Sequence, residues 1–135
     1  MVPNSVIEAI RAFFEGEDNV RLAFLFGSLA RKRARPDSDV DMAVLFKNPP
    51  SPLGRLGLCA NLEEHLKRNV DLISLNSAGP VIKMQVLKTG IKILGSRDVY
   101  EEFFVKTVRE YDDFKQIIAP QEGAVLRRRL WKTGT

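Results

Sequence analysis

Hydrophobic positions along this chain follow two spacings, and each spacing is typical of a different secondary structure. Apolar residues that recur every three or four positions are typical of a helix with one buried face, whereas short continuous apolar runs are typical of buried strands. The helical spacing covers residues 5–15, 52–66, 80–88 and 98–118, and the apolar runs cover residues 20–26, 40–46, 70–75 and 91–94. Helices and strands therefore alternate, and we predict one small α/β unit.

The ends of these elements coincide with residues that favour helix caps and turns. Ser51 is a typical N-cap, and Pro52 suits the first helical position. Pro120 ends the last long helix, so we expect a domain at residues 1–118 and a basic C-terminal tail at residues 119–135, as a short helix or partly disordered. The remaining signals are the capping-box pairs Ser5–Glu8 and Asp98–Glu101 and a C-cap glycine, Gly90.

Composition narrows the class of protein without identifying its chemistry. The chain has 135 residues, of which 44% are hydrophobic and 28% charged, as in an ordinary soluble globular domain with its own core. No apolar run is long enough to cross a bilayer, and the N-terminus lacks a secretion signal, so we expect a cytoplasmic protein with no membrane contact. A single cysteine, Cys59, excludes an internal disulfide and a thiolate zinc cluster. The net charge of +4 permits nucleic-acid binding but does not favour it.

Two carboxylates at the start of the second predicted strand indicate a metal site. Asp39 and Asp41 are two positions apart, and side chains two apart on a strand point to the same face. Two acids on one face repel each other unless a cation lies between them. Magnesium is the expected cation, because it binds a few carboxylate oxygens together with substrate phosphates.

A glycine and a serine follow the first predicted strand and indicate a phosphate-binding turn. Gly27 would let a phosphate approach the backbone closely, and Ser28 would open a short helix whose free N–H groups and hydroxyl bind phosphate oxygens. Arg31 adds a cation one turn later. A lone Gly-Ser pair is usually a plain turn, so the significance of this one comes from the acid pair that follows it.

A third aspartate lies inside another apolar run. Asp71 would be costly to bury without a partner. It either joins Asp39 and Asp41 around two metal ions, which could stabilise the attacking and leaving oxygens of an in-line displacement, or lies in water at the mouth of its strand. The presence of the acid pair favours the first interpretation.

These residues resemble the minimal nucleotidyltransferase family of the DNA polymerase β-like nucleotidyltransferase superfamily. The resemblance extends over about residues 5–118, and its motifs are Gly27-Ser28-x-Ala30-Arg31, Ser38-Asp39-x-Asp41 and Asp71. It implies a small mixed β-sheet flanked by helices. It also implies a nucleotidyltransferase that uses ATP as donor and two Mg²⁺ ions, transfers a nucleoside monophosphate and releases pyrophosphate.

The resemblance also implies a role for each site residue. Asp39 and Asp41 would hold both metal ions, and Asp71 would complete the site of the ion nearer the acceptor and help deprotonate the acceptor hydroxyl. Gly27 and Ser28 would position the outer phosphates. The chain departs from the family at Lys32, where members commonly have glycine, and the acids are unaffected by that change.

Little sequence remains after residue 94 to bind an acceptor, apart from one long helix and the tail. In this respect the chain resembles the antitoxins of HEPN/MNT toxin–antitoxin pairs. That resemblance implies a HEPN-type ribonuclease toxin as partner, and AMP transfer to a hydroxyl of that toxin, expected to be a tyrosine. Two alternatives stay open: a nucleotidyltransferase acting on a small molecule such as an aminoglycoside, and a non-catalytic antitoxin that neutralises by binding.

Other reactive residues have structural interpretations. His65 falls on the predicted helix 52–66, where a solvated or half-buried position is expected. Cys59 lies among leucines on the same helix and suits a small core residue. The basic run Arg127-Arg128-Arg129 could contact nucleic acid or a partner, or be a solvated tail.

Overall fold

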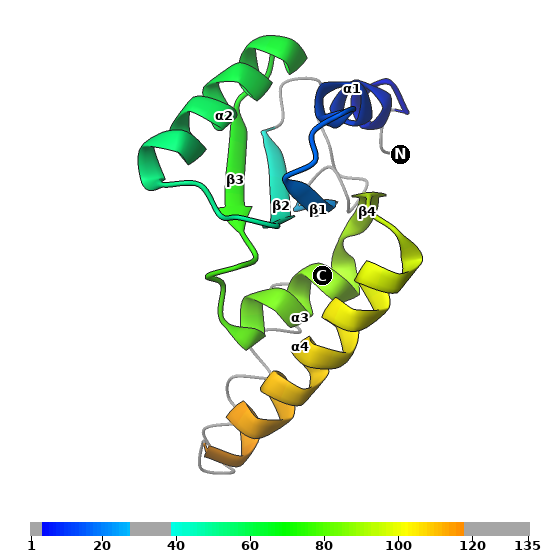
Figure 1. Cartoon of the computed structure of the whole chain (residues 1–135), viewed down its shortest axis with the longest axis vertical. Helices are drawn as coiled ribbons and strands as arrows, with labels where there is room; N and C mark the ends of the chain where they lie inside the picture. Colours follow the sequence, from blue (N-terminus) through cyan, green and yellow to red (C-terminus); the bar gives the residue numbers. More distant parts are fainter. Residues whose placement is uncertain (1–3, 28–38, 118–135) are drawn as a thin grey trace.

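Helices and strands are interspersed along the part of the chain that the structure describes. The structure is a computed structural model, and it describes residues 4–27 and 39–117 (Figure 1). The predicted turn helix after Gly27 and the predicted tail lie outside the described residues. The elements are α1 (Asn4–Phe14), β1 (Val20–Phe26), β2 (Val40–Phe46), α2 (Pro52–Leu66), β3 (Val70–Ser74), α3 (Pro80–Thr89), β4 (Ile91–Leu94) and α4 (Arg97–Ile117).

The strands form one mixed sheet in the order β3-β2-β1-β4, which confirms the predicted fold class. β1 pairs antiparallel with both β2 and β4, whereas β2 and β3 run parallel. Parallel neighbours need a long crossover connection, and α2 provides it. The pairing sets Asp41 beside Asp71 on β3 and beside Phe26 on β1.

Helices cover both faces of this sheet, so the molecule has a core on each side. Figure 1 shows α1 and α2 on one face and α3 and α4 on the other. Alternate residues of β2 are divided between the two cores: Met42 and Val44 pack with Ile10 and Leu62, while Ala43 packs in the other core. Asp41 therefore lies on the face that α3 and α4 cover.

Two helix starts show how local hydrogen bonds decide an N-cap. The Ser51 hydroxyl accepts a hydrogen bond from the Gly54 N–H at 3.1 Å, which confirms Ser51 as the cap of α2. The prediction for Asp98 is wrong, because α4 begins at Arg97 and the Ser96 hydroxyl accepts from the Val99 N–H at 3.2 Å. Asp98 is instead an acidic residue in the first turn, where its negative charge interacts favourably with the positive N-terminal end of the helix.

Two other predicted boundaries also differ from the structure. Ser5 lies inside α1, which already includes Asn4, so it is not the cap residue. Gly90 follows α3 as predicted, but its backbone is extended, with φ −80° and ψ 158°, so it needs no left-handed conformation. A glycine fits there because a Cβ would come within 2.5 Å of the Val86 carbonyl oxygen.

No helix among the described residues is both long and apolar enough to cross a membrane.

Candidate active site

Two of the three predicted acids meet on the sheet. Asp41 on β2 and Asp71 on β3 are direct partners in the parallel register. Residues in register on neighbouring strands point to the same face, so both carboxylates lie on the side of α3 and α4. Together they line a cavity of about 310 Å³. The register therefore joins two acids that are 30 positions apart in the sequence.

One helix face and the end of β1 form the other walls of this cavity. Phe26 and Gly27 contribute the end of β1. The α3 wall consists of Ile82, Gln85, Val86 and Thr89, which follow one another at the spacing of a single helix face. The cavity is thus bounded by an acid pair, a glycine turn and a helix surface that is half apolar and half polar.

Gly27 brings the backbone into contact with the acid pair. Its φ is +77°, a left-handed conformation that favours glycine. A Cβ at this position would collide with the Asp41 carboxylate and lie 2.9 Å from its Cγ. The residue is therefore restricted to glycine both by its backbone conformation and by the approach of Asp41.

Asp39 takes a different position from the other two acids. It immediately precedes β2, is exposed to solvent, and is not one of the residues that line the cavity. Within residues 4–27 and 39–117, no three His, Cys, Asp or Glu side chains are grouped closely enough to hold a metal ion. Ser28 and Arg31, the other predicted nucleotide contacts, lie outside the described residues.

The donor groups in the cavity fit a magnesium ion. Carboxylate oxygens are the ligands that Mg²⁺ prefers, and it commonly binds one or two carboxylates together with substrate phosphates. Asp41 and Asp71 supply such a pair on one face, and Gly27 leaves the adjoining backbone open to close approach. The arrangement can hold a metal-bound phosphate ester beside a carboxylate that is able to take a proton.

The structure adds α3 residues that the sequence analysis did not single out. The Thr89 hydroxyl donates to the Gln85 carbonyl oxygen at 2.8 Å, so it is engaged within its own helix. The Gln85 side chain is half-buried in the cavity wall. The periodic spacing of 82, 85, 86 and 89 could have marked this face, but only the packing of α3 on the sheet shows that it meets the acids.

Cys59 and His65 lie away from the cavity and keep their structural interpretations. Cys59 packs against the core of α1 and α2, and its thiol donates to the Val70 carbonyl oxygen at 3.0 Å. Burial raises the pKa of this thiol, and the negative charges of Glu63 and Asp71 raise it further. The exposed His65 has its Nε2 3.1 Å from the Ala9 carbonyl oxygen, which ties α2 to α1.

Known proteins share both this fold and this sequence pattern. Residues 8–98, which include β1 to β4, match the family model described as polymerase beta nucleotidyltransferase. The chain is 32% identical over 108 residues to the protein adenylyltransferase MntA of Shewanella oneidensis, covering 80% of this chain and 76% of the relative.

Solved structures give the same result for the fold. A toxin–antitoxin structure with AMP-PNP matches with a TM-score of 0.76 and 27% identity, over 92% of this chain and 98% of the other. A structure of the tri-AMPylated Shewanella oneidensis HEPN toxin in complex with MNT antitoxin matches with a TM-score of 0.66 and 28% identity, over 94% of both chains.

Proposed function

The chain belongs to the polymerase beta nucleotidyltransferase family, and from this premise we propose that it is the antitoxin of a HEPN-type toxin and transfers AMP from ATP to that toxin. The observation that carries the proposal is the register pairing of Asp41 with Asp71 beside Gly27 in one cavity. A relative of similar length is named a protein adenylyltransferase. A structurally similar antitoxin was solved together with an AMPylated HEPN toxin.

The transfer proceeds as an in-line displacement at the α-phosphorus of ATP. The acceptor is a hydroxyl of the toxin. The resemblance predicts a tyrosine, whose side chain carries such a hydroxyl. A bond forms between the hydroxyl oxygen and the α-phosphorus, and the bond from the α-phosphorus to the oxygen bridging to the β-phosphate breaks. Pyrophosphate leaves with that electron pair. Asp71 takes the proton of the hydroxyl, which makes the oxygen a better nucleophile.

The remaining site residues bind and orient the nucleotide. Asp39 and Asp41 would hold Mg²⁺, two ions by the resemblance, and Asp71 would complete the site of the ion nearer the acceptor. Magnesium, when bound, would supply positive charge that stabilises the transferring phosphate and the leaving pyrophosphate. Gly27 gives the outer phosphates room beside the backbone, while Ser28 and Arg31 bind their oxygens.

The product explains how the transfer would silence a ribonuclease. A phosphate diester on the acceptor hydroxyl adds negative charge and bulk beside the toxin's RNA site. RNA carries the same charge, so its entry is opposed both electrostatically and sterically.

The test is to incubate the chain with its toxin, Mg²⁺ and ATP labelled at the α-phosphate. We expect label on a single class of toxin hydroxyl, located by peptide mass spectrometry. Asp41→Asn and Asp71→Asn should each reduce labelling by orders of magnitude, because each removes charge stabilisation of several kcal/mol from the transition state. Asp98→Asn, an exposed acid of α4, is the matched control and should label at the normal rate.

Two results would contradict the proposal. One is the absence of labelling by folded wild-type chain, together with transfer to an aminoglycoside. The other is undiminished neutralisation of the toxin by the Asp41→Asn, Asp71→Asn double variant at equal stoichiometry, which would mean that binding alone neutralises.

A further inference from the structure

A second cavity opens at the far end of the same sheet face. It has a volume of about 290 Å³ and shares no lining residue with the cavity of the acid pair. Leu45 of β2 and Leu75 just after β3 line it from the sheet, and Phe103 and Thr107 line it from α4. Leu45 lies four positions after Asp41 on β2, which corresponds to about 13 Å along the strand.

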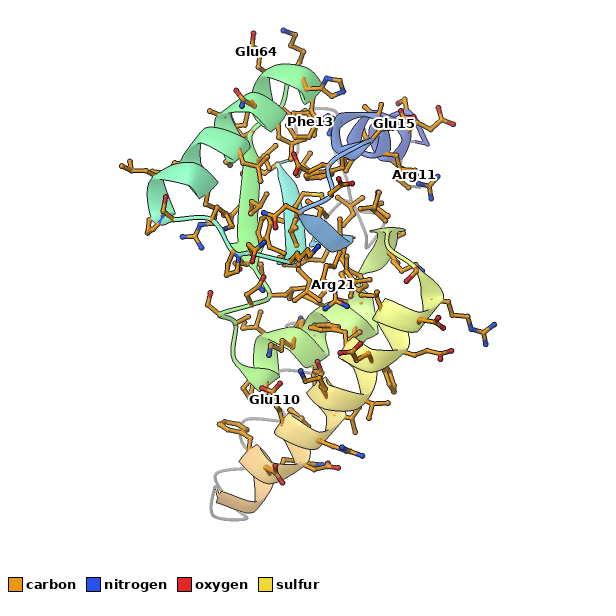
Figure 2. All side chains as sticks on the ribbon, viewed as in Figure 1. Arg11, Phe13, Glu15, Arg21, Glu64 and Glu110 are labelled. Carbon is orange, nitrogen blue, oxygen red and sulfur yellow. The ribbon has the colours of Figure 1, made fainter. Side chains whose placement is uncertain are left out.

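Basic side chains outnumber acidic ones around this cavity. Its charged lining residues are Arg21, Lys47, Lys83, Lys106, Glu102 and Glu110, which gives four positive charges against two negative ones. Figure 2 shows Arg21 and Glu110 on the side of the sheet where α3 and α4 lie.

The two acids are engaged by two of the four bases. Lys83 pairs with Glu110 at 3.1 Å, and the Lys83 side chain is only 13% exposed. Arg21 lies 4.0 Å from Glu102. Lys47 and Lys106 make no ion pair within the described part of the chain, so they leave the cavity with an uncompensated positive charge.

A buried hydroxyl in the wall lacks a partner. Thr107 is 1% exposed, and its Oγ1 has no hydrogen bond to any described residue. Buried hydroxyls are nearly always paired, so an unpaired one points to a partner group other than the residues that the structure describes. The neighbouring Asn76 is already committed, because its carboxamide bonds both the N–H and the carbonyl of Phe46.

We propose that this cavity binds a small anion of the phosphate class. The lysine ammonium groups and the threonine hydroxyl are all hydrogen-bond donors, and phosphate oxygens are acceptors that can take several such bonds at once. The volume lies at the small end of ligand pockets, which suits a phosphate or a pyrophosphate better than a larger molecule. The proposal does not depend on the AMP-transfer reaction, since none of these residues belongs to that site.

The test is an NMR titration of the ¹⁵N-labelled full chain in the absence of Mg²⁺. Inorganic phosphate, pyrophosphate and AMP are added in separate arms, with sodium chloride at matched ionic strength as the fourth. We expect saturable amide shifts near Lys47, Lys106 and Thr107 with at least one of the three phosphates, and none with chloride. The arm that saturates at the lowest concentration identifies the source of the phosphate group.

Variants separate specific binding from general attraction to a basic protein. Lys106→Ala should weaken binding roughly tenfold, as expected for one lost charged hydrogen bond. Thr107→Val should weaken it several-fold and should also raise the melting temperature of the anion-free protein, because it removes an unpaired hydroxyl without changing the shape. Arg97→Ala, which removes one positive charge from the exposed start of α4, is the control and should bind normally.

Three outcomes would overturn the proposal. The first is shifts that do not saturate, or that chloride reproduces. The second is saturable shifts confined to the surroundings of Gly27, Asp41 and Asp71. The third is unchanged affinity in both the Lys106→Ala and the Thr107→Val variants.

Discussion

At the scale of single residues, Gly27 carries the most restrictive geometry of the site. Its left-handed backbone and its contact with Asp41 act together. We expect Gly27→Ala to abolish nucleotidyl transfer and to lower the free energy of unfolding by more than the ~1–2 kcal/mol that a left-handed conformation costs a non-glycine residue. Urea unfolding and the labelling assay measure the two effects.

Gly16 offers a matched control for that substitution. Its φ of +79° is nearly the same as that of Gly27, but a Cβ there would meet nothing within 4 Å. Gly16→Ala should therefore cost only the backbone term, about 1–2 kcal/mol, and leave transfer unchanged. Equal losses of stability and activity in the two variants would show that the contact with Asp41 is unimportant.

Cys59 gives the pH dependence that the structure supports. Burial raises the pKa of the Cys59 thiol above the ordinary cysteine value of about 8.5, so the thiol of the native protein keeps its proton to higher pH. The raised pKa contributes stability at neutral pH, and that contribution is lost as the pH rises through the folded-state value. The thiolate is the reactive form of cysteine. The rate of alkylation by iodoacetamide, followed against pH, should therefore reach half its maximum at a pH above about 8.5. The same protein in urea is the control, and a native midpoint at or below its value would contradict the assignment.

At the scale of elements, Ser96 rather than Asp98 begins α4. We expect Ser96→Ala to lower the free energy of unfolding by about 1 kcal/mol, because it leaves the Val99 N–H without its acceptor. Asp98→Asn removes only a charge from the first turn and should cost about 0.5 kcal/mol. Chemical denaturation measures both losses. Because asparagine caps a helix as well as aspartate does, Asp98→Ala tests the cap itself, and a larger loss from Asp98→Ala than from Ser96→Ala would restore Asp98 as the capping residue.

The elements themselves were predictable because their signals are local. Apolar spacing alone located β1, β2 and β4 at their observed bounds, and Ser51 with Pro52 marked the start of α2. The N-cap of α4 was mispredicted because two capping residues lie two positions apart and sequence spacing does not rank them. What the sequence could not reveal is the face of α3 that meets the acids, since this depends on how the helix packs on the sheet.

At the scale of the whole molecule, the site depends on strand pairing. Asp41 and Asp71 were predicted from the residue pattern and the family resemblance, and the parallel register now places them side by side. Asp39, the other acid of the pair predicted on β2, precedes the strand and has no register partner on β3. The charged cavity at the other end of the sheet had no sequence signal, because its lining residues come from five separate segments of the chain.

Because two carboxylates are paired across parallel strands, we expect the stability of the domain to depend on Mg²⁺. Like charges directly opposite on neighbouring strands destabilise a sheet, so metal-free Asp71→Asn should be at least as stable as the metal-free parent. Mg²⁺ at about a hundred times its Kd should stabilise the parent by about 2.7 kcal/mol, and this increment should shrink sharply in Asp71→Asn. Melting temperatures with Mg²⁺ and with EDTA measure both effects, and Asp98→Asn should retain the full increment. If metal-free Asp71→Asn melted well below the metal-free parent, the carboxylate would stabilise the sheet by itself. If Mg²⁺ stabilised that variant by the full increment, the ion would bind elsewhere.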